Sequence, residues 1–131
     1  RMLLYNDLSA LKNEEELQTY EKKLVDRFGQ LPTEAVNLLN SVRIKWIATQ
    51  AGIEKLLLKQ NKMICYFVAD QQSDYYQSQQ FGKILQFVQL YPKLGELKEK
   101  NTKNGLRLMY TFDHIKSVAK ALEILQKLQR L

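Results

Sequence analysis

The hydrophobic spacing changes period in the middle of the chain, and this change restricts the fold more than any other feature. Residues 53–59 and 63–68 are short β-type runs on either side of a polar turn, Gln60-Asn61-Lys62. After a polar loop, residues 76–91 return to a helical spacing that Pro92 ends. The inward face of this helix is predicted to consist of Phe81, Ile84, Leu85 and Val88. The spacing predicts a β-hairpin followed by a helix.

The same order of elements is repeated in the last third of the chain. Residues 96–100 and 106–112 flank a turn that contains Asn104-Gly105, a pair that accepts the positive φ angles of a tight hairpin. Asp113 is predicted to cap a final helix with the apolar stripe Ile115, Val118, Leu122, Leu125 and Leu128. The second part is therefore predicted to be ββαββα, with an antiparallel sheet covered by helices on one face.

The first third of the chain has helical spacing throughout. Residues 2–11 form one apolar repeat, and Asn13 with Glu16 is a capping-box pattern that opens a second helix. This helix is predicted to end at Phe28, because Gly29 supplies a left-handed stop. Its buried stripe is predicted to be Leu17, Tyr20, Leu24 and Phe28.

A third helix is predicted between Pro32 and Gly52. Its apolar face is predicted to consist of Ala35, Val36, Leu39, Val42, Trp46 and Ile47. No Pro- or Gly/Ser-rich linker follows, so residues 1–131 are predicted to form a single α+β domain with a helical part, 1–52, and a ββαββα part, 53–131. The chain opens with Arg1 inside an amphipathic pattern, which indicates a fragment of a longer chain.

Composition narrows the class of protein. With 131 residues and 45% hydrophobic content, the chain can bury a core without disulfide or metal. The one cysteine, Cys65, lies in an apolar run and is predicted to be a buried, inert thiol. The lone cysteine and the absence of a signal peptide predict a cytoplasmic protein. No apolar stretch approaches the roughly 20 residues of a membrane span, so we expect no membrane contact.

Residue combinations that support catalysis are missing from the sequence. The five glycines form no phosphate-binding loop, and Cys65 and His114 are too few for a metal site or a nucleophile–base pair. The acidic run at residues 14–16 is explained by its place in the first turn of a helix. We expect no enzyme activity, cofactor or metal in this chain.

The net charge of +6 lies entirely in residues 53–131, and it leaves two interpretations open. The lysines are dispersed, which favours an ordinary solvated surface. A basic accessory domain that binds nucleic acid is the alternative, because aromatic and basic side chains together can hold bases and phosphates. The residues that would do so are Tyr75, Tyr76, Tyr110, Lys98, Lys100 and Arg107.

The most specific motif covers residues 24–32, with the sequence L-V-D-R-F-G-Q-L-P. Arg1-x-x-x-Tyr5 precedes it, and Ala51-Gly52-Ile53 follows the third predicted helix. Together these features resemble the C-terminal domain of the bacterial transcription-repair coupling factors (Mfd). The match is good over residues 1–58, and beyond them only the order of elements agrees.

The resemblance implies a parent that is an ATP-dependent, helicase-type DNA translocase with motors outside this chain. Proteins of that family displace stalled RNA polymerase and recruit the excision-repair protein UvrA. Their C-terminal domain is regulatory: it packs on the UvrB-homology module of the same chain and covers the surface that UvrA would use. The implied partners are that module directly, and UvrA and RNA polymerase indirectly. A structural cap of the parent remains an alternative.

The resemblance also implies an interdomain docking site at Lys23, Asp26 and Arg27. Helical geometry supports part of it, because Asp26 points away from the stripe that holds Leu17, and Lys23 lies to its flank. Asp26 can instead pair with Lys22 or Lys23, and Arg27 can fold back on its own helix. Phe28 is predicted to anchor the helix to the body of the domain.

Lys23 departs from the family pattern, which usually has Glu at this position. The lysine neutralises Asp26 and can pair with it within the helix. We hypothesise that docking is either rewired, with a compensating acid on the partner, or weaker than is usual in the family.

Overall fold

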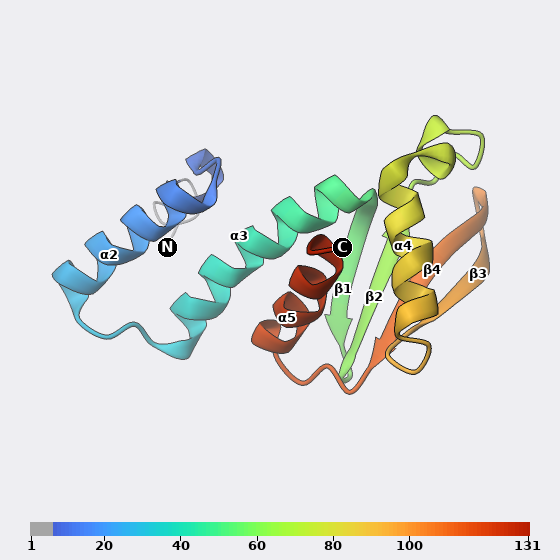
Figure 1. Ribbon diagram of the computed structural model, residues 1–131. Helices are drawn as coiled ribbons and strands as arrows, with labels where there is room; N and C mark the ends of the chain where they lie inside the picture. The colour runs from blue at the N-terminus through green and yellow to red at the C-terminus, as the bar shows by residue number, and fades with distance from the viewer. Residues whose placement is uncertain (1–6) are drawn as a thin grey trace.

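The computed structural model describes residues 7–131, and Figure 1 shows its helices and strands. Residues 7–10 are helical, while Arg1, Tyr5 and the first half of the helix predicted over residues 2–11 lie outside the described residues. The remaining elements are α2 (Glu14–Phe28), α3 (Thr33–Ala51), β1 (Ile53–Lys59), β2 (Lys62–Phe67), the 3-10 turn η1 (Asp74–Gln77), α4 (Gln79–Leu90), β3 (Glu96–Thr102), β4 (Gly105–Asp113) and α5 (Val118–Gln129).

The predicted ββαββα unit is confirmed. Its four strands form one antiparallel sheet in the order β1-β2-β4-β3, so the two hairpins meet along β2 and β4. Gln60 and Asn61 in the first hairpin turn both have positive φ, as a primed two-residue turn requires. In Figure 1, α4 and α5 lie on one side of the sheet, and α3 runs beside α5.

The main core lies between the sheet and these helices. Alternate residues of β2, namely Met63, Cys65 and Phe67, point into it and meet Ile84 and Phe87 of α4. Cys65 is buried there, and burial raises the pKa of its thiol to about 12. The predicted burial of Cys65 is confirmed, and the raised pKa disfavours the reactive thiolate near neutral pH.

A second, smaller core lies between α2 and the first half of α3. Leu8, Leu17 and Leu39 are buried in it, at 5%, 0% and 1% exposure. Figure 1 shows α2 standing off from the sheet and meeting the rest of the molecule through α3. We call α2 together with residues 29–43 the arm.

Because α3 joins the two cores, its buried face differs from the single predicted stripe. Leu39 faces the arm core, whereas Ile44, Ile47 and Ala48 face the sheet core. Val36 was predicted to face inward and is exposed instead. The prediction was wrong there because a helix that changes partners along its length does not keep one apolar stripe.

The structure corrects two further predictions, one about the cap of the last helix and one about the inward face of α4. The last helix is capped by Ser117, whose side chain accepts from the backbone N–H of Lys120 at 3.0 Å, and not by Asp113, the final residue of β4. In α4, Leu85 is 44% exposed and Phe87 is buried in its place. The helix begins at Gln79, capped by Ser78, and its inward face centres on Ile84 and Phe87.

Gly52 ends α3 and lets the chain turn directly into β1. Its φ is 81°, and a β-carbon placed on it would lie 2.1 Å from Cε1 of Tyr75. The Tyr75 hydroxyl donates a hydrogen bond to the carbonyl of Ala51, so the ring cannot move aside without breaking that bond. Both the positive φ and the close ring require glycine at this position.

We predict that Gly52→Ala destabilises the domain by roughly 2–4 kcal/mol, because backbone strain and overpacking add. The free energy of urea unfolding measures the effect. Gly82→Ala is the matched control, since Gly82 lies inside α4 with open space around it and φ is ordinary there. That change should stabilise the domain by about 0.5–1 kcal/mol. Equal effects of the two changes would contradict the proposed role of Tyr75.

Candidate protein-docking site

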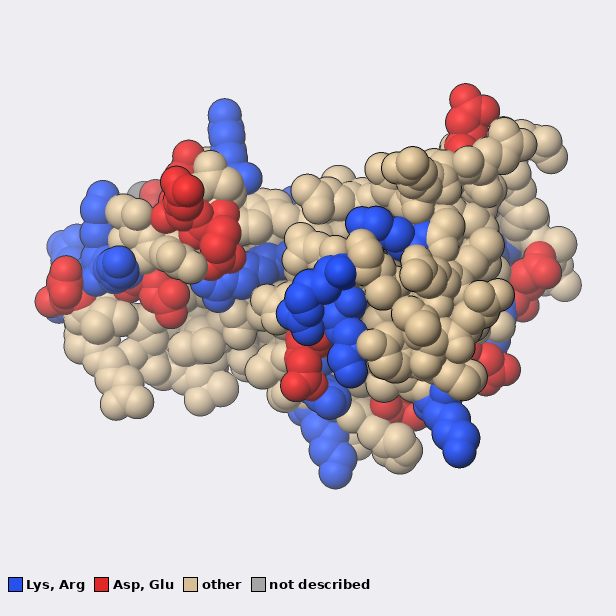
Figure 2. Space-filling model, in the orientation of Figure 1, with Lys and Arg blue, Asp and Glu red and all other residues tan. Residues whose placement is uncertain are grey.

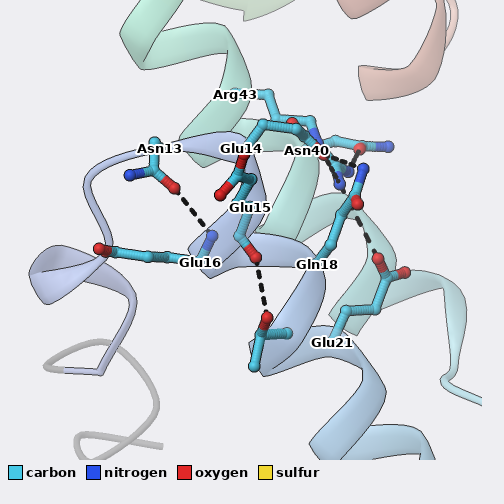
Figure 3. Close-up of polar contacts among 9 residues, drawn as sticks. Asn13, Glu14, Glu15, Glu16, Gln18, Glu21, Asn40 and Arg43 are labelled. Carbon is cyan, nitrogen blue, oxygen red and sulfur yellow. Dashed lines mark hydrogen bonds and ion pairs between the residues drawn. The ribbon is translucent and has the colours of Figure 1, made fainter.

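The start of α2 is fixed by a capping box. The Asn13 side chain accepts a hydrogen bond from the Glu16 N–H at 2.9 Å (Figure 3), and Glu16 Oε1 accepts from the Lys12 N–H at 2.9 Å. The predicted pair is confirmed, with the return bond made to the residue before the cap. Three acids in the first turn also suit the positive end of the helix dipole.

A bidentate ion pair joins this first turn to the middle of α3. Arg43 donates from Nε to Glu14 Oε1 at 2.9 Å and from Nη2 to Glu14 Oε2 at 2.8 Å, as Figure 3 shows. Its third nitrogen, Nη1, donates to Asn40 at 2.8 Å, and Gln18 donates to Glu14 at 3.0 Å. These hydrogen bonds, made chiefly by Arg43, lower the pKa of the Glu14 carboxyl.

The far end of α2 is held by its glycine stop. Gly29 has φ 79° and ψ −159°, a region that only glycine adopts readily, and its N–H donates to the carbonyl of Val25 at 2.7 Å. The predicted role of Gly29 as helix stop is confirmed. The D-R-F-G segment therefore lies at a sharp corner, where the chain turns from α2 into α3 (Figure 1).

Lys23, Asp26 and Arg27 are all exposed on the last two turns of α2. Among residues 7–131, neither Lys23 nor Asp26 has a hydrogen-bond or ion-pair partner, so the alternative pairing of Asp26 with Lys22 or Lys23 does not occur. The Arg27 guanidinium lies 5.5 Å from the centre of the Phe28 ring. Arg27 thus folds along its own helix while staying at the surface.

Phe28 is not the predicted inward anchor. It is 68% exposed, the largest exposure among the large apolar side chains of the described residues. The predicted buried stripe of α2 is wrong at Phe28 because the arm core ends before the last turn of the helix. Leu8 and Leu39 do not reach that turn, so Phe28 has no apolar surface to pack against. One sequence signal could have indicated this exposure: Phe28 is the last residue before the Gly29 stop, and the end of a helix often extends beyond the element it packs against.

Three apolar side chains are exposed around the corner between α2 and α3, those of Val25, Phe28 and Val36. In Figure 2, uncharged side chains occupy the lower side of this end of the molecule, and charged ones gather above them. A shallow hollow of about 420 Å³ lies beside α2, with Asp26, Val25 and Glu21 in its lining. Lys23 and Arg27 do not line it, so the structure divides the three predicted residues between two adjacent faces of α2.

The three tyrosines proposed for base stacking pack against other parts of the domain. Tyr110 is buried in the sheet core, where burial raises the pKa of its hydroxyl to about 12. Tyr75 packs against Phe67 and Phe81, and the Tyr76 hydroxyl donates to the carbonyl of Val68. Tyr110 is therefore not available for base stacking, whereas Tyr75 and Tyr76 are partly buried and pack edge-on against each other and Phe81.

Among residues 7–131, no three His, Cys, Asp or Glu side chains converge on a position that could hold a metal ion. No helix in that same range is long and apolar enough to cross a membrane.

Fold and surface together define an α+β domain with a helical arm that ends in an exposed, mixed charged and apolar corner. The family model for the TRCF domain matches residues 1–78. The chain therefore belongs to the TRCF domain family, the domain of transcription-repair coupling factors, and the family predicted from the D-R-F-G segment is confirmed.

Individual relatives agree with this assignment. The chain is 35% identical to the transcription-repair-coupling factor of Rickettsia conorii over 98 residues, which cover 75% of this chain and 8% of that protein. It is 39% identical to the Escherichia coli factor over 56 residues, or 43% of this chain and 5% of that protein. The chain thus spans less than a tenth of the length of the curated relatives it matches.

A solved structure extends the likeness to the second part of the chain. The C-terminal domain of a transcription-repair coupling factor superposes with a TM-score of 0.65 at 17% identity, over 98% of this chain and 80% of that one. At this identity the match shows the fold alone. It includes the ββαββα part, where the resemblance in sequence was limited to the order of elements.

We predict that Glu14→Gln destabilises the domain at pH 7 by roughly 0.5–1 kcal/mol, a modest value because about half of the Glu14 side chain is exposed. The folded-state pKa of Glu14 is depressed, so its contribution is present above the unfolded value of 4.5 and is lost as pH falls through the folded pKa. The difference between wild type and variant should therefore shrink in acid. Urea unfolding at several pH values measures it.

Glu15→Gln is the control for this prediction. Glu15 lies in the same first turn and faces the same helix dipole, yet its carboxylate has no ion-pair partner within the described range. A pH-dependent loss of the same size in both variants would assign the effect to the dipole and contradict a role for the bridge.

Proposed function

We propose that this domain regulates a transcription-repair coupling factor by docking on the UvrB-homology module of its own parent chain. Docking covers the surface that UvrA would use, so the domain is autoinhibitory and acts without chemistry of its own. The observation that supports this most is the state of Asp26: an exposed carboxylate without a partner among the described residues, in the segment that carries the family motif.

The construction of the arm supports a docking role. The Glu14–Arg43 bridge and the buried Leu17 fix one end of α2, and the Gly29 stop fixes the other. Side chains on the last two turns of α2 are therefore presented on a rigid element, which lowers the entropic cost of binding. Within the described residues, the side chains of Lys23 and Asp26 make no hydrogen bond or ion pair that would occupy them.

Phe28, exposed beside Arg27, adds a contact that the predicted site lacked. Arginine and aromatic residues dominate the binding energy of protein interfaces, provided that they become desolvated there. A guanidinium already placed over the ring presents both groups together. We therefore extend the proposed docking site to Lys23, Asp26, Arg27 and Phe28.

The proposed switch is a competition between an intramolecular contact and external partners. Such contacts gain from a high effective concentration, yet they are modest and partly polar, so they can open. In this proposal the parent is an ATP-dependent DNA translocase with motors elsewhere in its chain, and its engagement with RNA polymerase accompanies release of the domain.

We predict that the triple change Asp26→Ala, Arg27→Ala and Phe28→Ala in the full-length parent increases its affinity for UvrA. Truncating one side of a buried interfacial ion pair costs roughly 2–5 kcal/mol, against less than about 1 for a rim contact, so undocking should be marked. The stability of the domain should change by less than about 1 kcal/mol, because the side chains are exposed. Calorimetric titration with UvrA measures the gain.

The control removes the same kinds of side chain elsewhere: Asp74→Ala, Arg130→Ala and Leu90→Ala, all exposed in the domain. It should leave UvrA binding unchanged. Deleting the whole domain separates masking from a structural cap. Masking predicts a stable parent with increased UvrA binding, whereas an unstable parent and an inert triple variant would favour the cap.

A further prediction concerns Lys23, where we propose that docking is either rewired to an acidic partner group or weakened. The change Lys23→Glu, with UvrA binding of the parent as the readout, distinguishes these outcomes. Rewiring predicts poorer docking and tighter UvrA binding, and weakening predicts the reverse. Lys12→Glu, on an exposed lysine ahead of α2, controls for net charge. No difference between the two variants would remove Lys23 from the interface.

A further inference from the structure

The face of the sheet opposite α4 and α5 is covered by no helix of the described residues (Figure 1). The strand register assigns its side chains, because neighbours across an antiparallel pair point to the same side. Lys55 of β1 is paired with Tyr66 of β2, Tyr66 with Met109 of β4, and Met109 with Lys98 of β3. We call this side of the sheet the open face.

The open face is strongly basic. Its cations come from all four strands and are Lys55, Lys59, Lys62, Lys98, Lys100 and Arg107. Three acids balance half of them, since Lys62 pairs with Asp113, Lys98 with Glu96 and Arg107 with Glu54. Lys55, Lys59 and Lys100 keep no ion-pair partner among residues 7–131, so this one face carries an excess of three positive charges.

These unpaired lysines border a small apolar patch. Leu57 and Ile64 are cross-strand neighbours and only partly buried, and Met109 beside them is 8% exposed although no helix covers it. Lys55 and Lys59 lie along the β1 edge, and Lys100 lies on β3, the opposite edge. An apolar centre with a charged rim is the usual arrangement of a protein-binding surface.

Tyr66, the aromatic residue of this face, already contacts two cationic side chains. The Lys55 ammonium lies 5.4 Å from the centre of the Tyr66 ring, and the Arg107 guanidinium lies 5.6 Å from it. Sheets that bind single-stranded nucleic acid stack bases on free aromatic rings. Here the ring holds cations in place instead, which favours carboxylates over bases as the ligand.

We propose that the open face binds an acidic polypeptide segment, with carboxylates placed for Lys55, Lys59 and Lys100 and an aliphatic side chain on Leu57 and Ile64. The attraction is mainly electrostatic, so binding weakens as salt rises. This surface lies on different elements from the corner of the arm, and the proposal does not depend on that docking site.

Fluorescence anisotropy tests the proposal with a labelled peptide of about twelve residues built from Glu-Glu-Leu repeats, at about 50 mM salt. The variant Lys55→Gln, Lys59→Gln and Lys100→Gln should bind at least about tenfold more weakly than wild type, since three exposed charge pairs are lost. The control Lys83→Gln, Lys93→Gln and Lys116→Gln removes the same net charge from exposed positions off this face. Its affinity should fall by less than about threefold.

A labelled oligothymidylate of about fifteen nucleotides tests the other class of ligand. The proposal is overturned if the peptide does not bind wild type, or if both variants lose affinity equally. It is also overturned if the oligonucleotide binds more tightly than the peptide and is lost only in the Lys55, Lys59 and Lys100 variant. Amide shifts on peptide addition at Leu57, Ile64 and Thr111, the cross-strand neighbour of Ile64 on β4, would place the ligand on the open face.

Discussion

The bidentate contact between Arg43 and Glu14 is the polar constraint that orients α2 on α3, beside the small apolar core around Leu17. Without it, α2 would touch α3 mainly through the few buried side chains around Leu17 and Leu39. Arg43 is 18% exposed and gives all three guanidinium nitrogens to the arm, two to Glu14 and one to Asn40. A planar guanidinium can do this and an ammonium cannot, so the geometry fixes the angle between the helices as well as their distance.

The rest of the domain follows from α3 serving two cores. Its first half holds α2 through Leu39, and its second half holds the sheet and α5 through Ile44, Ile47 and Ala48. This division places the corner with Asp26 and Phe28 far from the sheet, and it leaves the open face of the sheet free (Figure 1). The two proposed binding surfaces therefore lie on parts of the molecule stabilised by different sets of contacts.

Local sequence signals predicted the elements well where one turn or cap decides them. The Asn13 cap, the Gly29 stop and the second hairpin each have a local physical cause, and each was found near where the sequence placed it. The turn of that hairpin is Lys103-Asn104, and Gly105, with φ 107°, is already the first residue of β4. Errors came where a neighbouring element decides burial, as for Val36, Leu85 and Phe28. Asp113 was mistaken for a cap because β4 extends through it and the helix begins only after Ser117.

The sequence by itself determined the order of elements, their turns and the family, because periodicity, capping residues and the D-R-F-G segment act over a few neighbouring positions. Only the tertiary structure decided which apolar residues are buried and which charges stay unpaired. Phe28 is exposed because α2 extends beyond the part of α3 that it packs against. Lys55, Lys59 and Lys100 share a face because strands distant in sequence belong to one sheet. Burial and pairing are properties of contacts between elements, which no local pattern records.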